Sequence, residues 1–210
     1  MIKFENLKFM SIGSNCADLW YLGQTRVHGP VDNIVIKSTA AIESLLDKTF
    51  LTNIYTEPFV EEPKLWAHTD DLNIILNYKD FKLVHNNPNT DKFKQELSNR
   101  LERLNTFINN IQQKENCWLV FNLNKYFVNE KHEATTEFTK LINLLKTKNL
   151  FTKTIFVQLK KRKLTTEHKW DAWLAKQDNL PKVITIYDVT DAKLANMQFK
   201  QQIKQLLKGE

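Results

Sequence analysis

The feature that most constrains the fold is the alternation of short apolar segments with amphipathic ones in the second half of the chain. Three apolar runs are typical of buried strands: residues 117–123, 154–159 and 182–189. Apolar side chains recur every three or four residues in three further segments, which predicts helices over 132–149, 167–177 and 191–208. The apolar positions of the last helix are Leu194, Met197, Ile203 and Leu206. This alternation predicts an α/β fold with a mostly parallel central sheet and helices on both faces.

The first half continues the pattern less regularly. Strands are predicted over 8–12 and 81–85, and amphipathic helices over 38–50 and from Phe93 to Ile111. Residues 51–80 contain two prolines and short apolar pieces, so they are predicted to be strand, loop or a small subdomain over a site. We expect one domain over residues 1–210, in which 51–80 is a loop-rich insertion.

Composition excludes several classes of protein. The chain has 210 residues, of which 42% are hydrophobic and 26% charged, as in an ordinary globular protein. Its apolar runs are too short to span a membrane, and its first residues contain Glu5 and no apolar leader. Two cysteines cannot form a disulfide framework. We therefore expect a cytoplasmic protein that has no membrane partner.

Cofactor, metal and nucleic-acid sites have little support in the sequence. The chain has four glycines and neither of the glycine-rich motifs that cradle dinucleotides and triphosphates. No cluster of His, Cys and Asp has metal-ligand spacing. The net charge of +6 comes largely from Lys160-Lys161-Arg162-Lys163, which by default is a solvated loop. We expect no cofactor, no metal and no nucleic-acid partner.

Polar residues follow each predicted strand, where a parallel sheet places its ligands. The set consists of Ser14, Asn15, Cys16, His85, Asn86, Asn87, Asn122, Asn124, Lys125, Tyr126, the run Lys160–Lys163, Asp188 and Asp191. Gly13 breaks the first strand, Ser14 is a suitable helix N-cap, and Gly23 stands where that helix would end. Cys16 would then lie in the first turn, where unpaired N–H groups and the helix dipole stabilise a thiolate. The alternative is that Cys16 is a small packing residue, as we expect of Cys117.

Two residues could assist a nucleophilic cysteine. His85 is the best candidate base among five histidines, because its strand is expected to end at the same edge of the sheet. Asp32 follows a Gly-Pro turn and is either a turn residue or the group that orients the histidine.

These motifs resemble a bacterial family of unknown function that is catalogued as papain-like cysteine peptidases. Its signature is a Leu-Gly-Ser-Asn-Cys-like motif followed by Pro-Phe-Asp-Trp. The two parts stand here as Ile12-Gly13-Ser14-Asn15-Cys16 and Pro30-Val31-Asp32-Asn33. A later helix with two arginines and the apolar run after it resemble the downstream half, so the similarity covers roughly residues 8–125. The resemblance implies Cys16 as nucleophile, His85 as base and Asp32 as orienter; Val31 and Asn33 replace two aromatic residues.

The family label and the periodicity predict different folds. Papain-type enzymes pack the cysteine helix against an antiparallel barrel, whereas this chain alternates strand and helix to its end. We therefore predict a Rossmann-like or SGNH-like three-layer fold and not a papain fold. A serine esterase of the SGNH type is not expected, because Gly13-Ser14-Asn15 replaces the Gly-Asp-Ser motif and the late Asp188-x-x-Asp191 lacks histidine.

Three functions remain open from the sequence. The first is a cysteine-dependent hydrolase or acyl- or glycan-modifying transferase acting on a small-molecule, glycan or peptide substrate. The second is a domain that binds phosphate or a sugar nucleotide at Ser14–Cys16, with Lys160 and Lys161 as neutralising cations. The third is an interaction module without a site.

Overall fold

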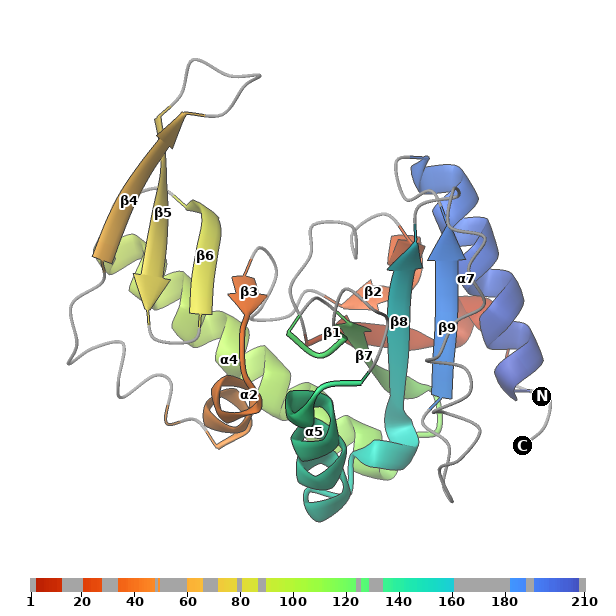
Figure 1. Ribbon diagram of the computed structural model, residues 1–210. Helices are drawn as coiled ribbons and strands as arrows, with labels where there is room; N and C mark the ends of the chain where they lie inside the picture. Colours follow the sequence, from red (N-terminus) through yellow and green to blue (C-terminus); the bar gives the residue numbers. More distant parts are fainter. Residues whose placement is uncertain are drawn as a thin grey trace.

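The computed structural model has two sheets, one parallel and one antiparallel (Figure 1). It describes residues 3–12, 21–27, 34–47, 49, 60–65, 72–78, 81–86, 90–123, 126–128, 134–160, 182–187 and 191–207. The strands of the parallel sheet are β1 (Lys8–Ser11), β2 (Arg26–Val27), β7 (Cys117–Leu123), β8 (Thr154–Lys160) and β9 (Lys182–Tyr187). Those of the antiparallel sheet are β3 (Ile34–Ile36), β4 (Val60–Leu65), β5 (Leu72–Tyr78) and β6 (Phe81–Asn86). The helices are α2 (Thr39–Leu46), α4 (Thr90–Gln113), α5 (Thr136–Thr147) and α7 (Ala192–Leu206), with short 3-10 turns η1 (Phe4–Asn6), η2 (Gly23–Thr25) and η3 (Phe151–Lys153).

The five-stranded sheet is parallel throughout and has the order β2-β1-β7-β8-β9. Its central strand β7 is buried along its whole length. A strand that is covered on both faces reads as a continuous apolar run, which is what residues 117–123 are. The predicted α/β fold, with a parallel sheet between layers of helices, is therefore confirmed, and it is not the antiparallel barrel of papain.

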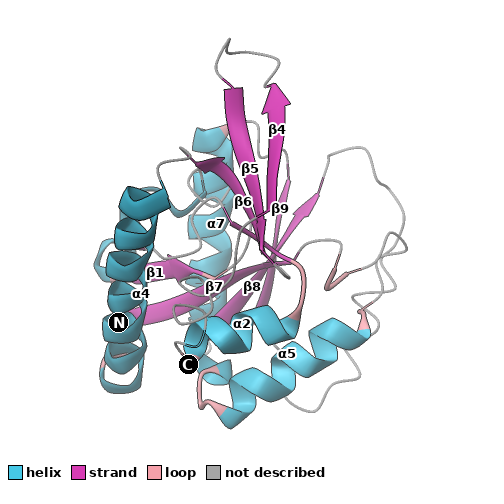
Figure 2. Ribbon diagram, turned by 90° about the vertical axis from the view of Figure 1, so that its left-hand side faces the viewer, coloured by secondary structure: helices cyan, strands magenta, loops and turns pink. Residues whose placement is uncertain are grey.

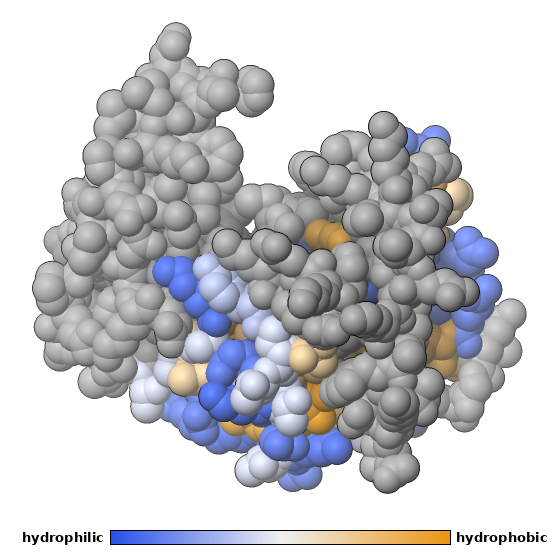
Figure 3. Space-filling model, in the orientation of Figure 1, coloured by the Kyte–Doolittle hydropathy of each residue, from blue (hydrophilic) through white to orange (hydrophobic). Residues whose placement is uncertain are grey.

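Two apolar clusters cover the two faces of this sheet. One contains Phe121 and Phe156 from the sheet and buried side chains of α2, α4 and α5. The other contains Trp118 and Val120 from the sheet and Phe199 of α7. The ring of Phe199 lies edge-on to the ring of Phe9, with 5.1 Å between the ring centroids. Figure 2 shows α2 and α5 side by side below the sheet, with α4 to the left. The described surface around α5 and along α7 is mostly hydrophilic (Figure 3), as expected of amphipathic helices.

Local signals set the ends of these helices. Ser38, Thr135 and Asp191 are N-caps whose side chains accept hydrogen bonds from backbone N–H groups of the first turn. Helix α5 ends in a Schellman motif: Asn149 has φ of 56°, and the Leu150 N–H donates to the Leu145 carbonyl at 2.8 Å.

Helix α7 corrects one expectation about the core. Met197 was expected on the apolar face, but it is 58% exposed, whereas Ala195, Phe199 and Ile203 are fully buried. The spacing of Leu194 and Met197 fits a helical face as well as that of the buried set does. The face that packs carries Ala195, Phe199 and Ile203, which belong to the same apolar cluster as Val120 of the sheet.

The antiparallel sheet has the order β3-β6-β5-β4 and lies to the left of the parallel sheet in Figure 1. Strands β4 and β5 come from the segment 51–80, for which strand was one of the predicted alternatives. That this segment covers a site, within one domain, stays a prediction. The predicted helix over 167–177 lies outside the described residues.

Candidate functional site

The order of the parallel strands defines where a ligand site is expected. From β1 the chain moves to β2 on one side, and from β7 it moves to β8 on the other side. The direction of winding thus reverses between β1 and β7. In open α/β sheets the ligand binds outside the carboxyl ends of the strands at this switch point.

Three buried polar side chains gather at the carboxyl ends of β1, β7 and β8. Ser11, Asn122 and Gln158 are 3%, 2% and 4% exposed. Ser11 is paired with Val120, so it lies on the same sheet face as Asn122, two residues further along β7. Gln158 is paired with Leu123, on the opposite face. Of these three residues, the sequence analysis predicted only Asn122 at the site. Ser11 and Gln158 could have been found because each is a single polar residue within an otherwise apolar run.

Gln158 differs from the other buried polar residues of the described chain. Its Oε1 atom is buried and has no hydrogen-bond partner. Thr25, Thr39 and Thr154, by contrast, each donate a hydrogen bond to a backbone carbonyl. An unpaired buried acceptor costs free energy, and natural folds keep few of them.

The structure describes the residues directly before and after the segment that carries Cys16. Ser14, Asn15 and Cys16 themselves lie outside the described residues. Before them, the Ile12 N–H donates to the Val120 carbonyl at 2.8 Å, which ties the start of the segment to the switch point. After them, Tyr21 is fully buried, with its ring 5.4 Å from that of Phe199.

Gly23 closes this segment in a backbone conformation that suits glycine. Tyr21 and Leu22 are helical, and Gly23 has φ of +52°, in agreement with the predicted helix end. Asn196 of α7 donates to the Tyr21 carbonyl at 2.7 Å, and a Cβ at Gly23 would lie 2.6 Å from the same Asn196 Nδ2. The absence of a side chain at position 23 therefore lets α7 hold this helix end.

The strand that carries His85 is not part of the parallel sheet. It is β6, which pairs antiparallel with β3 and β5. Only two residues join β5 to β6, which suffices for a hairpin and is far too short for a parallel crossover. The expectation that this strand ends at the edge of the parallel sheet was wrong. The side chain of His85 and all of Asp32 lie outside the described residues, so their roles stay predictions.

The cationic and acidic candidates fall at two further strand ends. Lys160 is the last residue of β8 and pairs with Tyr187, but its side chain, like Lys161 and Asp188, lies outside the described residues. Asp191 is the N-cap of α7, and its Oδ1 accepts from the Leu194 N–H at 3.0 Å. Asp191 thus has a structural role.

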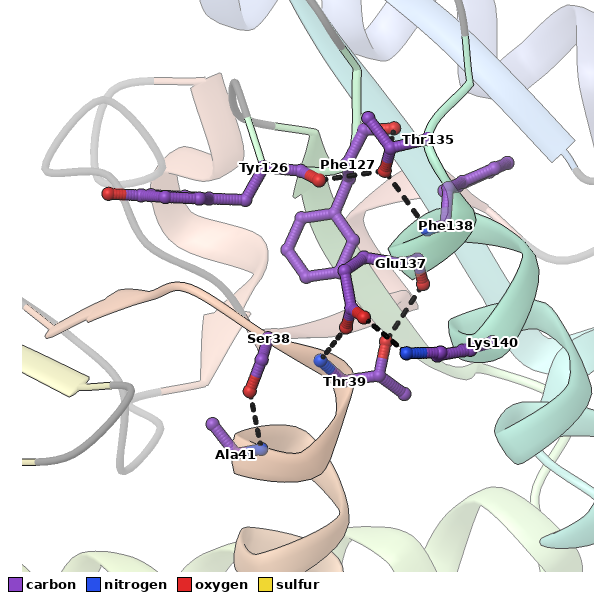
Figure 4. Close-up of polar contacts among 9 residues, drawn as sticks. All are labelled: Ser38, Thr39, Ala41, Tyr126, Phe127, Thr135, Glu137, Phe138 and Lys140. Carbon is purple, nitrogen blue, oxygen red and sulfur yellow. Dashed lines mark hydrogen bonds and ion pairs between the residues drawn. The ribbon is translucent and has the colours of Figure 1, made fainter.

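A polar cluster that sequence reasoning did not find joins the N-termini of α2 and α5 (Figure 4). The Glu137 carboxylate accepts hydrogen bonds from the Thr39 N–H and from the Lys140 ammonium, each at 2.8 Å. The Lys140 ammonium, and next the Thr39 N–H, lower the pKa of Glu137. All of these groups have partners within the cluster, so it holds two helices together and presents no reactive group.

Cys117 behaves as the packing residue that was expected. It is 5% exposed at the start of β7, and burial raises the pKa of its thiol. A neutral buried thiol is a poor nucleophile.

No group of three or more His, Cys, Asp or Glu side chains that could hold a metal occurs among the described residues. None of the described helices is both long and apolar enough to cross a membrane. We compared the chain with models of protein families, with curated proteins and with solved structures, and none of them matches it.

Proposed function

We propose that this chain is a cysteine-dependent hydrolase or acyl- or glycan-modifying transferase with Cys16 as its nucleophile. The observation that carries the proposal is the switch point between β1 and β7. Cys16 follows the last residue of β1 by five positions, so the chain itself ties it to the edge where α/β sheets bind ligands. The buried Ser11 and Asn122 add polar groups at that edge.

The chemistry requires a base and a group that accepts charge. His85 is proposed to take the Cys16 proton, so that the sulfur bonds to the carbonyl carbon of the substrate and the leaving group departs with that proton. Water then releases the acyl group in a hydrolase, and a substrate hydroxyl does so in a transferase. Backbone N–H groups near Ser14 and Asn15 would stabilise the oxyanion.

Asp32 is proposed to orient His85: its carboxylate would accept a hydrogen bond from the imidazole and hold the ring in position.

Alkylation of Cys16 as a function of pH tests the proposal. Cys117→Ala leaves Cys16 as the single thiol, and iodoacetamide labelling is followed by mass spectrometry. We expect Cys16 to titrate below the value of about 8.5 for a free cysteine, and His85→Gln to change the profile. A Cys16 that reacts no faster than free cysteine at neutral pH would rule out an activated thiolate.

Binding of an anion without catalysis is the second candidate. Lys160 is the last residue of β8, and β8 lies next to β7 in the parallel sheet, so the chain position of Lys160 supports a cation near the carboxyl edge of that sheet. Lys160 and Lys161 would then neutralise a phosphate or a sugar nucleotide. A thermal-shift series with phosphate, nucleotides and sugar nucleotides tests this, since a ligand at a hundred times its Kd adds about 2.7 kcal/mol to stability. If no anion stabilises the protein, this candidate is excluded.

A further inference from the structure

Strand β9 is the last strand of the parallel sheet, so one row of its backbone groups faces away from β8. Two glutamines of α7 form hydrogen bonds with these outward-facing backbone groups. The Thr185 N–H donates to Gln202 Oε1 at 3.0 Å, and Gln202 Nε2 donates to the Thr185 carbonyl at 2.5 Å. Gln198 makes the same pair of bonds with Tyr187, at 2.9 and 2.8 Å. Each glutamine thus makes the two hydrogen bonds that a residue of a neighbouring strand would make.

The spacing of the two elements explains why this match is possible. Residues four apart on a helix are separated by about 6 Å along its axis. Residues two apart on a strand, whose backbone groups face the same way, are separated by about 6.6 Å. Helix α7 runs antiparallel to β9. Gln198 therefore bonds to Tyr187, and Gln202, one turn later, bonds to Thr185, two residues earlier in the strand.

Apart from Lys182 at its start, the sequence of β9 gives its edge no other protection. The strand reads Lys-Val-Ile-Thr-Ile-Tyr, which is rich in β-branched residues and contains no proline. By contrast, the edge strand β4 of the antiparallel sheet carries two glutamates, a lysine and Pro63. Charges and proline are the usual means of blocking an edge. In β9 the blocking groups come from the following helix.

We propose that Gln198 and Gln202 act as a substitute strand that prevents β9 from pairing with the β9 strand of a second copy of this chain. Without them, two β9 edges related by a two-fold axis would pair antiparallel, because a symmetric dimer uses the same surface on both copies. Tyr187 is 42% exposed at this edge and adds apolar surface to such a contact.

The double variant Gln198→Ala/Gln202→Ala tests the proposal by light scattering after gel filtration over a range of concentrations. The matched control is Gln201→Ala/Gln205→Ala, which removes two exposed amides of the same helix. We expect the double variant to shift toward twice the wild-type mass as its concentration rises, and the control to keep the wild-type mass. A folded double variant that keeps the wild-type mass at every concentration would overturn the proposal.

Amide hydrogen exchange in the single variants decides the matter if the double variant does not fold. Gln202→Ala should speed exchange of the Thr185 amide by about tenfold, and Gln198→Ala should do the same for Tyr187. Exchange should be unchanged in Gln201→Ala. Unchanged exchange at Thr185 and Tyr187 would show that the glutamines do not hold this edge, and it would overturn the proposal.

Discussion

Thr39 and Glu137 form two hydrogen bonds that set α2 beside α5. The Thr39 N–H donates to the Glu137 carboxylate and the Thr39 hydroxyl donates to the Glu137 carbonyl, each at 2.8 Å. At the other ends of the same helices, Lys148 forms an ion pair with Asp47. The two helices therefore run parallel, with their positive N-terminal dipole ends together. Glu137 offsets this repulsion because its negative charge lies between the two ends.

Replacement of Glu137 should loosen this helix pair. In Glu137→Ala, the Thr39 N–H loses its acceptor and two helix N-termini lose a compensating charge. We expect the free energy of unfolding to fall by about 1–2 kcal/mol, as for other lost caps and charge-assisted hydrogen bonds. Denaturant unfolding at neutral pH measures this. Glu43→Ala on the exposed side of α2 is the control, and an equal loss in both variants would contradict the assigned role.

The contribution of the Glu137 charge should also depend on pH. Its pKa is lowered in the folded state by the Lys140 ammonium and the Thr39 N–H, relative to about 4.3 in an unfolded chain. A lowered folded pKa means that the stabilisation is complete above the unfolded pKa and is lost as the pH falls through the folded pKa. The difference in unfolding free energy between wild type and Glu137→Gln should therefore shrink in acid. A difference that stays constant from neutral to acid pH would show that the charge is not responsible.

Gly23→Ala should destabilise the chain for two separable reasons. The backbone has φ of +52°, which costs a residue with a side chain about 1–2 kcal/mol. In addition, the new Cβ would lie 2.6 Å from Asn196 Nδ2, so the hydrogen bond from Asn196 to the Tyr21 carbonyl would be displaced.

A double-mutant cycle with Asn196→Ala separates these two costs. Once Asn196 is truncated, the Cβ has room and only the backbone cost remains. We expect the double variant to lose less unfolding free energy than the sum of the losses in the two single variants. The difference, which is the coupling energy, should be about 0.5–1 kcal/mol, as is usual for residues in contact. Strict additivity would mean that the amide moves aside without cost.

The helices and strands that the structure describes in the second half could be predicted because their signals are local. Residues 117–123 were predicted as a strand and form β7 with the same bounds. Pairing partners are set by the whole chain, and for this reason the strand of His85 was assigned to the wrong sheet. The glutamines at positions 198 and 202 carry no sequence signal, since their partners are backbone groups of a different element.

The candidate site was predictable only in its position on the chain. The motif that ends in Cys16 follows the first strand, as expected, but the switch point depends on the strand order, which no single segment encodes. Glu137 was missed because its partner Thr39 is 98 residues away. Contacts of this range are fixed by packing and not by local propensity.

Gln158→Leu should stabilise the protein, which is unusual for a change at a strand end. The Gln158 side chain is 4% exposed and its Oε1 atom has no partner, so the wild type bears the cost of desolvating this acceptor. Leucine has a similar size and removes that cost, and we expect a gain in unfolding free energy of about 1–3 kcal/mol. Thr154→Val in the same strand is the contrasting variant, because its hydroxyl donates to the Leu150 carbonyl at 2.8 Å, and it should lose stability. Denaturant unfolding of both variants measures these opposite changes in unfolding free energy.

A loss of stability in Gln158→Leu would show that the Gln158 amide has a partner in solution. A gain would mean that the chain keeps an unpaired acceptor at the ligand edge of its sheet at the expense of stability, as a residue kept for binding would.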